Sequence, residues 1–199
     1  MNSTNSNEEV AFELKKEFIY NAIDDNENTI RFLDTKVGGV YVVIGLIIAF
    51  LGGINESIYN TLVYFKSDLI DFIIIITSIL GYAILTTISV IYGFFTIKSI
   101  NNPLKHIDST DVNCEESLWH LSVNKNGNIA QSLKDYIRKI NELNYQDLLQ
   151  QISCELMKIS YIRNEKLNKS NLCIKYFISS LIPLCIILIY IFVYYCFIK

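Results

Sequence analysis

Three long runs of uncharged, mostly apolar residues dominate the hydropathy pattern of the chain. They cover residues 37–55, 72–97 and 176–198 and are 19, 26 and 23 residues long. A helix needs about 20 residues to cross the hydrocarbon core of a bilayer, which is ~30 Å thick. The runs therefore predict three transmembrane helices. The first run is at the lower limit of length, so a re-entrant segment is the alternative there.

The polar segment 1–36, which precedes the first run, has the periodicity of an amphipathic helix. From about residue 8 to residue 36, apolar side chains recur at spacings of seven, four and three. Asn26 falls inside this apolar stripe. It either faces solvent on a loosely packed helix or fixes the register of helices in an oligomer.

The polar segment 98–175, between the second and third runs, is predicted to be helical from residue 131 onward. Two apolar stripes that are rotated relative to each other predict a bend or a helix break near residues 141–148. No glycine or proline follows before Pro183. The second helix of this segment is therefore expected to run on into the third span and to carry cytoplasmic movements into the membrane. Pro183 is expected to kink that span.

Together these elements predict an all-α integral membrane protein. Its three transmembrane helices would be accompanied by an N-terminal cytoplasmic helix and by a helical cytoplasmic segment between spans two and three. Near the span ends, nine Lys and Arg residues lie on the side of 1–36 and 98–175, against two on the other side. Because cytoplasmic loops carry the excess of Lys and Arg, we expect a cytoplasmic N-terminus. The segment 56–71, a short loop, and the C-terminus are expected outside.

The composition agrees with this class and narrows the function. Of 199 residues, 51% are hydrophobic and 19% are charged, and the net charge of −3 argues against nucleic acid as a partner. The chain has no phosphate-binding loop, no dinucleotide fingerprint and no HExxH motif. Its two histidines are far apart, and its five cysteines include no C-x-x-C pair. We therefore predict no enzyme, no catalytic residue, no metal site and no cofactor.

Two of the predicted spans carry faces of small or polar residues. On the first span, a narrow arc that permits close approach of another helix holds Gly38, Gly45, Ala49 and Gly52. On the second span, a stripe of polar and small residues consists of Ser78, Tyr82, Thr86, Ser89, Gly93 and Thr96. Lipid leaves polar groups unsatisfied, so this stripe packs on helices of its own chain or forms the face of a homo-oligomer that lines an aqueous pathway. No ionisable residue lies inside a span, which argues against an ion-coupled transporter.

A run of basic residues precedes the third span. It consists of Lys158, Arg163, Lys166, Lys169 and Lys175. Anchoring at the cytoplasmic side, with contact to anionic membrane lipid, is the expected role. Binding of a phosphorylated signal, or of the acidic N-terminal helix, is the alternative.

Several short motifs resemble those of the Pycsar-effector transmembrane (PycTM-like) family. The sequence IRFLDTKVGG at residues 30–39 is similar to the D-x-K motif with which that family opens its first span. Pro103 and the sequence QQISCELMKISYIR at 150–163 are similar to the proline after the second span and to the helix that feeds the last span. The chain departs from the family pattern at Val37, where alanine is usual, and at Arg163, where lysine is usual.

The resemblance implies a bacterial inner-membrane effector of antiphage defence. After infection a nucleotide cyclase would make cyclic CMP or cyclic UMP as activating ligand, and the effector would impair the inner membrane and abort the infection. The junction formed by Ile30, Asp34 and Lys36 would couple the signal to the spans. No recognisable nucleotide pocket is present, so the ligand binds either between protomers in the helical region or to another protein. Two other functions stay open, a membrane adaptor that anchors a cytoplasmic partner and a constitutive holin-like toxin.

Overall fold

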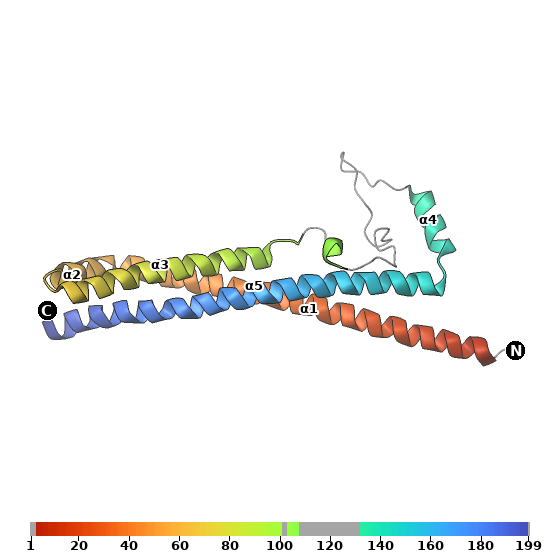
Figure 1. The fold of residues 1–199 in the computed structure, drawn as a ribbon, viewed down its shortest axis with the longest axis horizontal. Coiled ribbons are helices and arrows are strands. Elements are labelled where there is room, and N and C mark those ends of the chain that lie inside the picture. The colour runs from red at the N-terminus through yellow and green to blue at the C-terminus, as the bar shows by residue number, and fades with distance from the viewer. Residues whose placement is uncertain (1–2, 101–102, 108–131, 199) are drawn as a thin grey trace. The chain divides into compact units, whose positions relative to one another are not determined.

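The structure is a computed structural model of the chain, and it describes residues 3–100, 103–107 and 132–198. Every regular element in these ranges is helical, and no strand occurs in them, which confirms the all-α prediction. Figure 1 shows the elements α1 (Ser3–Gly53), α2 (Asn55–Phe65), α3 (Leu69–Ile97), α4 (Leu133–Glu142) and α5 (Tyr145–Val193). A short 3₁₀ turn, Pro103–His106, follows α3, and a π-helical turn, Tyr194–Ile198, follows α5.

Three of the helices are long and apolar enough to cross a membrane. They are Val10–Gly53, Leu69–Ile97 and Tyr145–Phe197. Each contains one of the three uncharged runs, so the prediction of three candidate spans is confirmed by length and composition. The first run continues α1 without a break as far as Gly53. The run therefore forms one continuous helix with the segment that precedes it.

The helix break expected near residues 141–148 is confirmed, and side-chain caps explain its position. Helix α4 ends at Glu142 and α5 begins at Tyr145. The side-chain oxygen of Asn144 accepts a hydrogen bond from the backbone N–H of Asp147 at 2.8 Å, which satisfies a donor at the start of α5. From there α5 runs unbroken through Pro183 to Val193. The expected continuation into the third span is therefore confirmed.

The connection between the first two spans is more ordered than the short loop expected from the sequence. Most of it is α2, in which Thr61 is buried and donates to the Ser57 carbonyl at 2.8 Å. Helix α3 then begins after Asp68, whose carboxylate accepts from the backbone N–H of Ile70 at 3.1 Å. An aspartate at this N-cap position satisfies an N–H that has no partner within the helix.

The chain divides into two compact units, which are described separately. The first, here called the polar unit, contains Met1–Ile30 and Ile100–Asn164. The second, here called the membrane unit, contains Arg31–Ser99 and Glu165–Lys199 and thus all three uncharged runs. Helices α1 and α5 contribute residues to both units.

In the polar unit, Asn26 joins α1 to α5. Its side chain is only 5% exposed, and its amide nitrogen donates to the Ser160 hydroxyl at 3.1 Å. The solvent-facing alternative for Asn26 is therefore wrong. Further along, the rings of Phe12 and Tyr145 lie 4.7 Å apart. A buried polar pair inside an otherwise apolar contact favours one register of two helices, here within a single chain.

The core of the membrane unit draws side chains from all three long helices, which Figure 1 shows running alongside one another in this unit. Its buried apolar residues include Leu33, Val37 and Ile44 from α1, Ile75 and Tyr82 from α3, and Cys173, Leu184 and Ile187 from α5, and α2 adds Phe65. The outward faces carry large exposed apolar side chains such as Leu46 and Leu80. Such a surface is expected where a helix bundle meets lipid rather than water.

Candidate functional site: a polar seam in the membrane unit

The polar stripe of α3 is enclosed within the chain. All six of its members are buried, namely Ser78, Tyr82, Thr86, Ser89, Gly93 and Thr96. They share one face because they recur every three or four residues, and that face meets α1 and α5. We call these six residues, together with the buried Ser170 of α5, the polar seam. Of the two alternatives for the stripe, the single chain adopts packing against its own helices.

Gly93 allows α1 and α3 to approach closely. The hydroxyl of Tyr41 on α1 donates to the backbone carbonyl of Val90 at 2.8 Å. A Cβ atom at position 93 would lie 2.6 Å from the Tyr41 hydroxyl oxygen and 2.9 Å from two of its ring carbons. Real Cβ atoms do not come this close to other heavy atoms. The ring of Tyr41 can therefore occupy this position only against a glycine.

Ser89 joins α3 to α5 in the centre of the unit. Its hydroxyl donates to the backbone carbonyl of Cys173 at 2.8 Å, and both residues are completely buried. Near this contact the rings of Tyr92 and Tyr176 stack with centroids 5.6 Å apart and almost parallel planes. A hydroxyl bonded to a carbonyl of a neighbouring helix is a common way to hold transmembrane helices together.

Three hydroxyls in the polar seam have no hydrogen-bond partner among the described residues. They belong to Tyr82 and Thr86 on α3 and to Ser170 on α5. The hydroxyls of Ser78 and Thr96 bond within their own helix, to the Ile74 carbonyl at 2.7 Å and to the Tyr92 carbonyl at 3.0 Å. A buried polar group without a partner costs about 1–3 kcal/mol. The closed bundle therefore holds polar groups that an arrangement with access to water would satisfy.

An ion pair links α1 and α5 at the edge of the membrane unit. The Lys166 ammonium donates to both carboxylate oxygens of Asp34, at 2.7 and 2.8 Å. The Lys166 side chain is 7% exposed, and that of Asp34 is 37% exposed. The pair thus joins a residue of the D-x-K motif to a residue of the basic run. The other two residues of the predicted junction take no part in this pair. Lys36 is exposed, and Ile30 belongs to the polar unit.

The basic run does not form one surface. Lys158 is buried in a pair with Glu155 at 2.7 Å, and Lys166 is buried against Asp34. The remaining three side chains lie further out: Arg163 bonds to Asn164, Lys169 pairs with Glu165 at 3.1 Å, and Lys175 is exposed. Lys158 and Lys166 are therefore engaged inside the chain rather than directed towards lipid headgroups.

No described residue packs closely against the glycines of the small-residue face on the first span. An ideal Cβ atom at Gly38, Gly45 or Gly52 would meet nothing within 4 Å, and Ala49 is exposed. The contacts of α1 are made instead by the adjacent face that carries its buried apolar residues and Tyr41. The close helix approach expected at these glycines is thus not made inside the chain. It occurs at Gly93, on another helix.

A second polar contact, which the sequence did not suggest, lies at the far end of the membrane unit. The hydroxyl of Tyr190 on α5 donates to the carboxylate of Asp71 on α3 at 2.8 Å. The ring of Phe65 lies 5.3 Å from that of Tyr190, and Tyr64 lies 5.4 Å from Tyr194. Tyrosines clustered at the end of a span are typical of the membrane–water interface. The aromatic residues at positions 64–65 and 190–195 were the available sequence signal.

The described parts of the chain offer no metal centre. No group of three or more His, Cys, Asp or Glu side chains in residues 3–100, 103–107 and 132–198 could hold a metal ion. The groups that the structure describes at this site are hydroxyls and the ion pair between Asp34 and Lys166. Such groups can hold a bundle closed or, when rearranged, face water.

Comparison with known families gives one match. The matching family model is described as the Pycsar effector protein domain, and it covers residues 18–193. Comparison with curated proteins and with solved structures finds no match. The matched region includes all of α2, α3, α4 and α5 and most of α1. The polar seam and the Asp34–Lys166 pair therefore lie within it.

Proposed function

The chain belongs to the Pycsar effector family, and on that premise we propose that it is the membrane effector of a cyclic-nucleotide-signalled defence system. The family acts in antiphage defence, and the three candidate spans make the chain a multi-pass membrane protein. In the proposed mechanism, copies of the chain assemble in the bacterial inner membrane after the signal. The assembly impairs the membrane, and the infected cell stops growing before phage mature.

The observation that carries this proposal is the set of unpartnered hydroxyls in the polar seam. Tyr82, Thr86 and Ser170 are buried among apolar helices with no partner in the described structure, and each such group costs about 1–3 kcal/mol. The closed bundle is a poor minimum for these residues. An assembly in which the stripe of α3 faces water would satisfy them. The free-energy cost of these hydroxyls in the closed bundle therefore lowers the free energy that the signal must supply to open the polar seam.

The Asp34–Lys166 pair supports a signal input at the junction between polar and apolar segments. It fixes α1 to α5 three residues before the uncharged run of α1 and ten residues before that of α5. Because Lys166 is almost fully buried, loss of its partner leaves a charge without compensation. A signal that displaces either helix at this point would have to break the pair. Both spans would then be released from their fixed register.

For the signal itself we propose a cyclic pyrimidine nucleotide, cyclic CMP or cyclic UMP, made by a nucleotide cyclase. It would act on the polar unit, for which the excess of Lys and Arg near the span ends supports a cytoplasmic location. It binds either between protomers or to another protein that contacts the effector. The chain would perform no catalysis in this scheme, and its family is not a known enzyme family.

Membrane potential in bacteria that express the chain tests this function. The chain is expressed with an active cyclase that makes cyclic CMP or cyclic UMP, and in parallel with a catalytically inactive cyclase. We expect depolarisation with the active cyclase only. Depolarisation with both would contradict the proposal and favour the constitutive toxin. Depolarisation with neither would favour an adaptor that anchors a cytoplasmic partner.

A further inference from the structure

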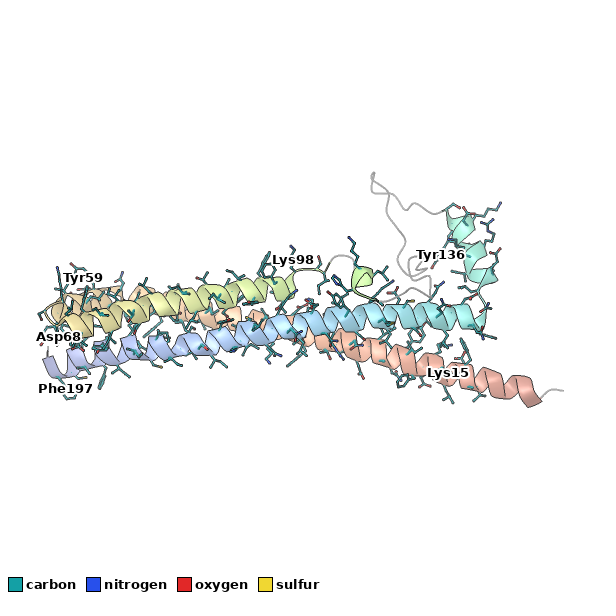
Figure 2. The ribbon with its side chains drawn as sticks, in the orientation of Figure 1. Lys15, Tyr59, Asp68, Lys98, Tyr136 and Phe197 are labelled. Carbon is teal, nitrogen blue, oxygen red and sulfur yellow. The ribbon has the colours of Figure 1, made fainter. Side chains whose placement is uncertain are left out.

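Helix α4, in the polar unit, presents an apolar stripe that nothing in the described structure covers. Its three members, Leu133, Ile137 and Ile140, follow one another at spacings of four and three and are all exposed, Leu133 by 74%. No residue of α4 is buried. Figure 2 shows the side chains of α4, with Tyr136 labelled. An amphipathic helix of this kind normally covers its apolar side with a partner.

A second uncovered stripe lies on the N-terminal part of α1, in the same unit. Val10, Leu14 and Phe18 are spaced four residues apart and exposed, Phe18 by 71%. They lie on the side of α1 opposite to Ile19 and Asn26, which are buried. Contact with α5 therefore leaves this stripe free. It spans about 12 Å along the helix and that of α4 about 11 Å, at 1.5 Å per residue.

The α1 stripe is flanked by carboxylates and the α4 stripe by an ammonium. On α1, exposed Glu13 and Glu17 follow Val10 and Leu14 by three residues, and the one exposed lysine beside this stripe, Lys15, precedes Phe18 by three. On α4, exposed Lys134 precedes Ile137 by three residues. Residues three apart are neighbours on a helix surface. An α4 laid on the Glu17 side of this stripe would therefore bring the Lys134 ammonium next to a carboxylate.

We propose that α4 of one copy docks on the α1 stripe of a second copy of this chain. A second copy fits because it brings the matching stripe length and the opposite charge, and because no residue of α4 is buried in the part of the chain that the structure describes. The inference rests on the assembly step of the proposed function and names the surface that makes it. Each pair of copies would form two equivalent contacts, α4 to α1 and α1 to α4, as expected for an isologous dimer.

A charge-exchange experiment tests this interface in the full-length chain. Two copies with different tags are expressed together in bacterial membranes with the active cyclase, and recovery of one through the tag of the other is measured. Glu17→Lys in both copies, or Lys134→Glu in both copies, should lower recovery about threefold or more, because attraction becomes repulsion. Ile137→Asn should lower it about tenfold, since it removes the central apolar anchor. All three residues are exposed, so the fold should be unaffected.

Mixing the two charge variants distinguishes contact between copies from contact within one chain. When one copy carries Glu17→Lys and the other Lys134→Glu, both contacts between unlike copies again pair opposite charges. Recovery should then return towards that of the unmodified pair. Within each single chain, in contrast, the like charges remain. Glu142→Lys, the same charge change on the opposite side of α4, is the matched control and should leave recovery unchanged.

The outcomes separate this inference from the proposed function. If unmodified copies fail to co-purify, the assembly step of the proposed function is wrong, and the interface with it. If they co-purify and neither Glu17→Lys nor Ile137→Asn changes recovery, the interface is wrong while assembly stands. If the single variants weaken recovery and the mixed pair does not restore it, α4 contacts its own chain and the inference is overturned. Restoration by the mixed pair supports it.

Discussion

The ammonium of Lys166 on α5 makes two hydrogen bonds to the carboxylate of Asp34 on α1, at 2.7 and 2.8 Å, although the residues are 132 positions apart in sequence. The pair lies where both helices approach their uncharged runs. The lysine is almost fully buried, and the aspartate keeps part of its surface in solvent. This ion pair holds α1 and α5 in one register, and its partly exposed Asp34 side remains accessible from solvent.

Asp34→Ala should separate the signal from membrane damage. The substitution leaves the Lys166 ammonium buried without its partner, which should cost about 1–3 kcal/mol of stability. The extent of depolarisation should then be the same with the active and with the inactive cyclase. Membrane potential with active and inactive cyclase measures this, together with a check that the protein is still inserted. The double exchange Asp34→Lys with Lys166→Asp should restore dependence on the cyclase.

Glu165→Ala is the matched control for that experiment. It breaks the pair with Lys169, which lies on the same helix and is partly exposed. Exposed pairs within a helix contribute about 0.3–0.5 kcal/mol. Normal signalling is therefore expected in this variant. Normal signalling in Asp34→Ala as well would reduce the junction to an interfacial anchor.

Gly93→Ala should destabilise the membrane unit. The added methyl group would lie 2.6 Å from the hydroxyl oxygen of Tyr41, so the ring must leave its place between α1 and α3. We expect a loss of about 1–3 kcal/mol, measured as a lower midpoint of thermal unfolding of the detergent-purified protein. In Gly81→Ala, on the same helix, the nearest atom to the new methyl group is Pro183 Cβ at 3.8 Å. That variant should unfold like the unmodified protein, and equal midpoints for both variants would refute the close packing at Gly93.

Thr86→Val should stabilise the closed bundle and weaken the response to the signal. The two side chains have nearly the same shape, and the hydroxyl that is removed has no partner among the described residues. Removal should gain about 1–2 kcal/mol. Depolarisation at a given level of cyclase should fall several-fold.

The adjacent Thr87→Val provides the comparison for that variant. Thr87 is exposed on α3, and its hydroxyl donates to the Ala83 carbonyl within the helix at 2.8 Å. Its replacement should change neither stability of the bundle nor depolarisation by much. An unchanged response in Thr86→Val, or an equal decrease in both variants, would contradict a role of the polar seam in opening.

The helices were predictable because their signals are local. Run length and the absence of charge identify the three candidate spans, and the rotation between two apolar stripes locates the break between Glu142 and Tyr145. The continuity of α5 followed from the lack of glycine or proline before Pro183. Helix α2 was missed because its eleven residues carry apolar and polar side chains in a segment too short for a clear period.

The contacts between helices were not predictable, because they join residues that are far apart along the chain. The polar stripe of α3 was identified in full, but Cys173 on α5, whose carbonyl accepts from Ser89, is apolar and gave no signal in the sequence. The glycines of α1 suggested a close approach that is made instead by Tyr41 against Gly93. Sequence spacing defines which side chains share a face. Which face meets which helix depends on the packing of all three.

The most direct measurement of the central claim is the water accessibility of the polar seam before and after the signal. Thr86→Cys is placed in a chain whose five native cysteines are replaced and whose depolarisation is still signal-dependent. The cells are treated with a charged thiol reagent that reacts only where water reaches the thiol. Leu80→Cys, on the exposed face of the same helix, reports reaction on the lipid side.

We predict that Thr86→Cys is labelled only with the active cyclase and that Leu80→Cys is labelled in neither state. This result would mean that the stripe of α3, packed inside the resting bundle, faces water in the active one. Depolarisation on signal with Thr86→Cys unlabelled throughout would contradict the account, because the membrane would then be impaired without opening of the polar seam.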